Sequence, residues 1–130
     1  MSTVIQRHTW SREEYERMVT AGVFHAEARL ELIDGEIVNM VPQGSPHATA
    51  VLLLDNELRN ICEGGFHVRV QMPLALDDSS EPEPDLAIVS GNPRDYSRAH
   101  PGSAALVVEI SDTTLSYDRN TKKRLYARNG

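Results

Sequence analysis

Two apolar runs in the second half of the chain each carry a single carboxylate. The runs read EPDLAIV at residues 83–89 and AALVVEIS at residues 104–111. A carboxylate that is withdrawn from water either takes up a proton or finds a cation. If the two runs form neighbouring strands, Asp85 and Glu109 can share one divalent metal ion, because such ions bind carboxylate oxygens.

The length and composition of the chain predict one domain. With 130 residues the chain can bury a core, so we expect a single domain over residues 1–130. Its formal net charge of -6 excludes a basic field over the whole molecule, so any contact with nucleic acid must be local. The single cysteine, Cys62, lies in an apolar run and predicts a small core side chain in a reducing compartment. Residues 1–11 lack a signal region and no aliphatic run is long enough to cross a membrane, so we expect a cytoplasmic protein.

The first part of the chain, residues 1–44, predicts a helix and a β-hairpin. Ser11 and Glu14 have the spacing of a capping box, which indicates a helix over residues 12–19. An Asp-Gly dipeptide between two apolar runs is typical of the two-residue turn of a hairpin, here over residues 30–40.

The second part, residues 45–130, predicts a mixed α/β core. We expect a long, core-facing helix that Ser45 caps, a strand over residues 66–76, an acidic turn over residues 77–82, the two carboxylate-bearing strands, and a last helix over residues 117–128. The predicted apolar stripe of the first of these helices consists of Val51, Leu54, Leu58 and Ile61.

These motifs resemble the Uma-type endonuclease family of bacteria, long catalogued as a domain of unknown function. The resemblance covers nearly the whole chain and includes Pro84-Asp85, Glu109-Ile110-Ser111, the segment ELIDGE at residues 31–36 and His47. That family belongs to the restriction-endonuclease-like PD-(D/E)XK superfamily. The resemblance implies a mixed sheet flanked by helices, and a nuclease that uses Mg²⁺ or Mn²⁺ to hydrolyse phosphodiester bonds of nucleic acid, DNA in preference to RNA.

The lysine of the superfamily signature is missing two residues after the glutamate, where this chain has Ser111. The resemblance implies that the lysine has moved to the following helix. Lys122 fits better than Lys123, because Asp118, Lys122 and Tyr126 share one helix face at steps of four. The alternative is an ordinary solvated basic face, which would still be the only concentrated basic surface of an acidic chain.

Each candidate also has a plainer interpretation. Asp85 can be an acid that starts a turn after proline, and Glu109 can belong to a buried salt bridge. Glu31 shares an apolar hairpin face, so it is either a third metal ligand or an edge-strand carboxylate that reaches water. His47 lies four residues before Val51 on the buried stripe, so it is either a site residue or a satisfied histidine at the helix start.

Two functions remain open at this point. The first is catalysis, with Asp85 and Glu109 as metal ligands and Lys122 as the cation that stabilises developing charge. The second is a catalytically inactive structural or interaction protein of the same fold. In the resembled family the chain continues past the glycine that matches Gly130, so we expect the sheet to lack its C-terminal strand. An open sheet edge invites pairing with a second copy, and we therefore expect a homodimer.

Overall fold

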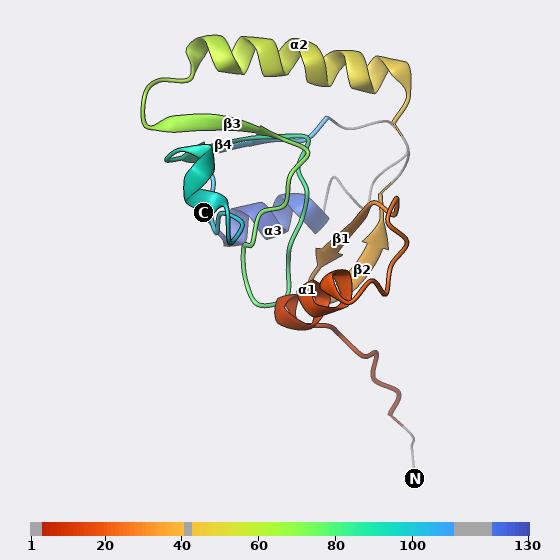
Figure 1. The fold of residues 1–130 in the computed structure, drawn as a ribbon. Coiled ribbons are helices and arrows are strands. Elements are labelled where there is room, and N and C mark those ends of the chain that lie inside the picture. The colour runs from red at the N-terminus through yellow and green to blue at the C-terminus, as the bar shows by residue number, and fades with distance from the viewer. Residues whose placement is uncertain (1–3, 41–42, 111–120) are drawn as a thin grey trace.

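The elements alternate between helices and strands along the chain, and they form a mixed α/β fold (Figure 1). The structure is a computed structural model that describes residues 4–40, 43–110 and 121–130. Within these ranges it has three α-helices and two small antiparallel sheets, and the N-terminal helix is followed by a β-hairpin. The predicted fold class is therefore confirmed. No helix in the described part of the chain is long and apolar enough to cross a membrane.

Helix α1 (Arg12–Thr20) begins at the predicted capping box. The Ser11 hydroxyl accepts a hydrogen bond from the Glu14 backbone N–H at 3.1 Å, and the Glu14 carboxylate accepts one from the Ser11 N–H at 3.0 Å. These two bonds satisfy donors that the first turn of a helix leaves free. The start of α1 is thus determined by local sequence.

Strands β1 (Leu30–Ile33) and β2 (Glu36–Asn39) form the predicted hairpin. Asp34 and Gly35 form its turn with φ values of 48° and 82°, which is the left-handed conformation of both central residues that a tight hairpin requires. The register places Glu31 opposite Val38. Glu31 is only 3 % exposed, so it is not an edge carboxylate that reaches water.

The second sheet has the order β3-β4-β5, and both pairings are antiparallel. Helix α2 (Ser45–Ile61) lies along one face of this sheet (Figure 1), where Val51 and Leu58 pack with Leu86. The opposite face packs on Leu74 and on side chains of the segment after β4. The strands are β3 (Phe66–Val70), β4 (Leu86–Ser90) and β5 (Leu106–Val108).

Two predictions about α2 are wrong. Gly44 caps the helix without a side-chain hydrogen bond, and Ser45 is already helical. The predicted stripe is buried only at Val51 and Leu58, whereas Leu54 is 36 % and Ile61 67 % exposed. The periodic pattern marks a face that can be buried, but the short sheet beneath α2 covers only part of it.

Two element boundaries and the burial of Cys62 differ from the sequence-based expectation. Strand β3 ends at Val70, because Gln71 has a φ of 50° that breaks the extended chain. The expected acidic turn extends only to Ser80, since Glu81 pairs with Leu32 beside the hairpin. Cys62 is half-buried rather than a core residue. Helix α3 spans Lys123–Arg128, and the chain before it is described only from residue 121, so Ser111, Asp118 and the expected start of this helix at residue 117 lie outside the described residues.

Candidate active site

Asp85 and Glu109 flank one edge of the β4-β5 pair. In the antiparallel register Leu86 lies opposite Val108, so the residue before β4 meets the residue after β5. A hydrogen bond of 2.8 Å from the Ile110 N–H to Asp85 Oδ2 fixes this arrangement. The expectation that Glu109 lies inside its strand is wrong, because β5 ends at Val108. The two carboxylates nevertheless lie directly beside each other's strand ends, Asp85 just before β4 and Glu109 just after β5.

Asp85 is anchored on both carboxylate oxygens. Its second oxygen, Oδ1, lies 3.0 Å from Nε2 of His47, which is in the first turns of α2. The Asp85 residue is only 6 % exposed, and the side chain of His47 is 18 % exposed. The helix start therefore brings the histidine to the aspartate, and the orientation of this carboxylate is fixed from two elements.

Lys122 joins the hairpin to the end of β5. Its Nζ lies 2.6 Å from Glu31 Oε1 and 3.2 Å from Glu109 Oε1, and its side chain is 3 % exposed. The backbone N–H of Glu83 donates to the same Glu31 oxygen at 2.8 Å. The ammonium group is thus buried between two carboxylates from elements that are far apart in the sequence. Lys123, in contrast, is exposed.

Tyr126 completes this cluster from α3. Its hydroxyl donates a hydrogen bond of 2.8 Å to Glu109 Oε1, the oxygen that also contacts Lys122. Lys122 and Tyr126 are four residues apart, so both reach Glu109 from one side of the chain. The spacing that the sequence offered for these two residues therefore brings them to the same carboxylate.

The Glu109 carboxyl is partly buried, with a side chain that is 29 % exposed, and it lies near other carboxylates. Its pKa is raised to about 7, chiefly by burial and to a smaller extent by the charges of Asp85 and Glu31, against the opposing effects of Lys122 and Tyr126. Burial likewise raises the pKa of the Tyr126 hydroxyl, which keeps its proton to donate. The charges of Asp85 and Glu31 both act on Glu109, so a divalent cation beside Asp85 and Glu109 would be electrostatically favourable.

The donor set fits a hard divalent cation. Magnesium binds carboxylate oxygens and commonly needs only one or two of them from the protein. Asp85 and Glu109 supply such a pair at one edge of the sheet. No cluster of three or more His, Cys, Asp or Glu side chains in the described ranges has the geometry to hold an ion, so the fit depends on these two carboxylates alone.

The sequence interpretation missed Glu83. This residue holds Glu31 through its backbone N–H, and burial and the Glu31 charge raise the pKa of its own carboxyl. A backbone donor leaves no mark on the residue type, so the contact had no direct sequence signal. The segment Glu81-Pro82-Glu83-Pro84 offered an indirect one, because prolines favour an extended chain that can run beside a strand.

The fold and the cluster define a mixed α/β protein with acidic residues and a lysine gathered at a sheet edge, which is consistent with the restriction-endonuclease-like superfamily. A sequence model of the Uma2 family, described as "Putative restriction endonuclease", matches residues 12–130. The chain therefore belongs to the Uma2 family. No curated protein matches this chain significantly.

Proposed function

We propose that this protein is a metal-dependent endonuclease that hydrolyses phosphodiester bonds of nucleic acid. The observation that carries the proposal is the buried ammonium of Lys122 between Glu31 and Glu109, 2.6 Å and 3.2 Å from their oxygens, at the sheet edge where Asp85 precedes β4. Membership of the Uma2 family supports a nuclease-like function. Such a cluster combines carboxylates for a metal ion with a cation for a phosphate.

Asp85 and Glu109 would hold Mg²⁺ or Mn²⁺. When bound, such an ion supplies Lewis-acid activation of the scissile phosphate and of a water molecule. Lys122 would stabilise the negative charge that develops on the phosphate oxygens. Glu31 keeps the ammonium in place, since it is itself fixed by the Glu83 N–H. Glu31 thus acts as a positioning residue for Lys122. The alternative role for Glu31 is that of a third metal ligand.

His47 and Tyr126 position the two metal-binding carboxylates. His47 contacts Asp85 Oδ1 and the Ile110 N–H contacts Oδ2, so the Asp85 carboxylate cannot rotate freely. The hydroxyl of Tyr126 fixes Oε1 of Glu109 in the same way. A prearranged carboxylate pair loses less conformational freedom when an ion binds.

The proposal extends to the substrate, the location and the oligomeric state of the enzyme. We infer DNA rather than RNA as the substrate, the cytoplasm as the location, and a homodimer as the active form. Light scattering on the protein as it elutes from a size-exclusion column tests the homodimer, because a dimer has twice the mass of the monomer. A monomer that cleaves DNA would contradict the dimer alone.

Calorimetric titration with Mn²⁺, paired with cleavage of supercoiled plasmid DNA, tests the proposal. We expect binding in the wild-type chain and its loss in both Asp85→Ala and Glu109→Ala, with loss of cleavage in the same variants. Glu57→Ala is the matched control, because Glu57 is an exposed glutamate on α2. Metal binding that survives both site substitutions would overturn the proposal. A chain that neither binds Mn²⁺ nor cleaves DNA would favour the inactive interaction protein.

A further inference from the structure

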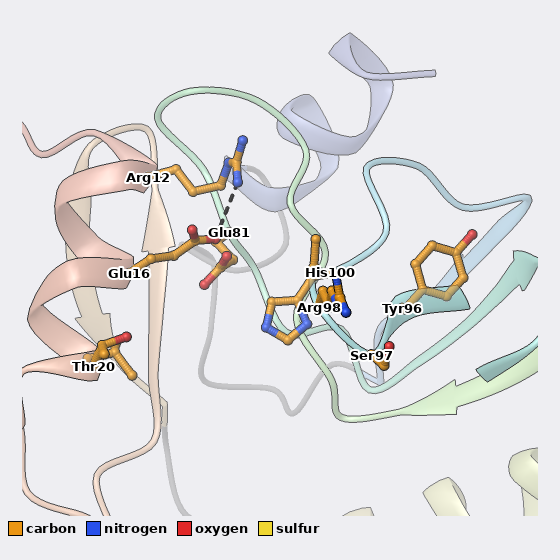
Figure 2. A pocket seen from close by; sticks show the side chains of 10 residues that line it. Arg12, Glu16, Thr20, Glu81, Tyr96, Ser97, Arg98 and His100 are labelled. Carbon is orange, nitrogen blue, oxygen red and sulfur yellow. Dashed lines mark hydrogen bonds and ion pairs between the residues drawn. The ribbon is translucent and has the colours of Figure 1, made fainter. Parts of the chain in front are cut away.

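A separate pocket lies between α1 and the chain that follows the 3-10 helix η1 (Pro93–Tyr96) (Figure 2). Its volume is about 390 Å³, within the range of pockets that bind small molecules. None of its lining residues belongs to the candidate active site. Its charged or titratable lining residues are Arg12, Glu16, Glu81, Arg98 and His100.

The Glu81 carboxyl is buried in the wall of this pocket with one oxygen unused. The residue is 6 % exposed, and its Oε1 has no hydrogen-bond partner in the part of the chain that the structure describes. Burial, a hydrogen bond with Glu16 and the charge of Glu16 raise the pKa of Glu81 to about 8. The two carboxyl groups therefore share one proton at neutral pH, and the Glu81 carboxyl extends from the 77–84 segment toward Glu16 on α1 (Figure 2). An unused buried acceptor is costly, so the pocket favours a ligand that donates a hydrogen bond.

The charges around the pocket favour an anionic ligand. Arg98 is exposed and has no ion pair within the described residues. Arg69 does not line the pocket, but its guanidinium lies 5.8 Å from the centre of the ring of Tyr96, which does; Arg69 is 8 % exposed, and its Nε has no hydrogen-bond partner among the described residues. Among the described residues, its side chain has the Pro73 carbonyl at 3.2 Å as its one hydrogen-bond acceptor and no carboxylate in an ion pair.

The balance of charge is consequently positive at this place in an acidic chain. Arg12 contacts Glu16 at 3.2 Å, and the proton shared by Glu16 and Glu81 leaves that pair with a single negative charge. The pocket that holds this charge is lined by two guanidinium groups, those of Arg12 and Arg98. Burial and the nearby arginines lower the pKa of His100, which leaves its ring neutral for stacking or hydrogen bonding.

We propose that this pocket binds one nucleotide of the substrate strand, with an exocyclic amino group of the base donating to Glu81 Oε1 and a phosphate against Arg98. The choice of a nucleotide over other anions with N–H donors, such as an α-amino acid, rests on the proposed nuclease function. The position suits it, because Glu81 is two residues from Glu83, which binds the Lys122 cluster through Glu31. Two extended residues span about 7 Å, a distance that an unstacked strand covers within one or two nucleotides.

Cytidine and uridine monophosphates form a matched pair of probes. At position 4 of the base, cytidine carries an amino group and uridine carries a carbonyl oxygen. Calorimetry on the wild-type chain should give about tenfold tighter binding of the cytidine nucleotide. The uridine oxygen would face the Glu81 oxygen, and both are acceptors. The measurement needs no substitution in the protein, so a folding defect cannot obscure it.

Two substitutions of Glu81 refine the test. Glu81→Gln should keep the preference, because its amide can donate to Glu16 while its carbonyl remains in the place of Oε1. Glu81→Met keeps the side-chain length without an acceptor and should bind both nucleotides equally. Arg98→Ala should weaken both nucleotides alike and leave the unphosphorylated nucleoside unchanged. Asp85→Asn should leave the preference intact while it abolishes cleavage.

The possible outcomes distinguish failure of the proposed nucleotide pocket from failure of the proposed nuclease function. Equal binding of the two nucleotides by the wild-type chain, no binding at millimolar nucleotide, or binding of an α-amino acid in their place would each overturn the nucleotide pocket. If plasmid cleavage and Mn²⁺ binding persist in that case, the proposed function stands. A Glu81-dependent cytidine preference without metal binding or cleavage would support the pocket and overturn the nuclease.

Discussion

Lys122 is a cation that the fold buries between two carboxylates, so its replacement should be costly. Lys122→Met leaves Glu31 and Glu109 facing each other without the ammonium that now lies 2.6 Å and 3.2 Å from them. Breaking a buried ion pair from one side costs about 3 kcal/mol or more. We expect a loss of about 3 kcal/mol in the free energy of unfolding, measured with urea, together with loss of cleavage.

Lys123→Met is the matched control for this substitution. Lys123 is exposed on α3, so its replacement should change the free energy of unfolding by less than about 0.5 kcal/mol. Equal stability of the two variants would contradict the buried ion pair. Cleavage retained by Lys122→Met would contradict the role of Lys122 in stabilising charge.

Glu81 makes the stability of the protein depend on pH. Its pKa is about 8 in the folded chain, above the ordinary value of 4.5, through burial and the hydrogen bond and charge of Glu16, against Arg12. The folded state then binds more protons than the unfolded state between these values. The free energy of unfolding should therefore fall as pH rises from about 4.5 to about 8.

Glu81→Gln removes this titration and should flatten the pH profile by on the order of 2 kcal/mol over that window. Glu83 and Glu109 shift in the same direction as Glu81, so the informative quantity is the difference between the two profiles. Urea denaturation of both proteins at about pH 5, 6, 7 and 8 measures this difference. A variant profile parallel to that of the wild type would show that Glu81 is not protonated in the folded chain.

The hairpin turn holds Gly35 where no other residue fits. Its φ is 82°, and a Cβ built on it would lie 2.6 Å from the Thr9 Cβ. Gly35→Ala combines an unfavourable backbone conformation with a clash, so we expect a loss of about 2 kcal/mol. Because the same hairpin carries Glu31, Mn²⁺ affinity should weaken as well. Gly64→Ala, at a position with no heavy atom within 4 Å of the new Cβ, should change stability by less than about 0.5 kcal/mol.

Elements with local signals could be predicted from the sequence. The Ser11 capping box and the Asp-Gly turn involve residues within four positions of each other, and both appear in the structure as expected. The pairing of β4 with β5 meets the condition under which the sequence predicted a shared metal site. The burial of α2 could not be predicted, because the exposure of Ile61 depends on where the short sheet ends.

The residues of the candidate site and of the Glu81 pocket also differ in how far the sequence could predict them. The spacing of Lys122 and Tyr126 indicated that they reach one place, and both contact Glu109. The pocket around Glu81 escaped prediction because its position depends on pairing with Leu32, almost fifty residues earlier in the chain. Long-range pairings of this kind leave no periodic trace in either segment.

At the scale of the whole molecule, the charge distribution limits how nucleic acid can bind. The formal net charge is -6, so attraction to a phosphate backbone must come from few residues. Arg128 is engaged by Asp34 at 2.7 Å and by Asp77 at 2.9 Å. Lys123 and Arg124 are exposed and have no ion pair within the described ranges, so they are the basic groups beside the candidate site that are free to contact phosphates.

A small number of phosphate contacts predicts a shallow salt dependence. Each phosphate that a cation neutralises adds about 0.9 to the slope of log affinity against log salt concentration. For duplex DNA binding to an Asp85→Asn chain, we expect the double variant Lys123→Gln/Arg124→Gln to reduce that slope by about 2. The double variant Arg59→Gln/Arg94→Gln removes the same charge elsewhere and should lower the affinity only slightly, with the slope unchanged. Equal changes in both double variants, measured by fluorescence anisotropy over a salt series, would mean that net charge rather than the α3 surface governs binding.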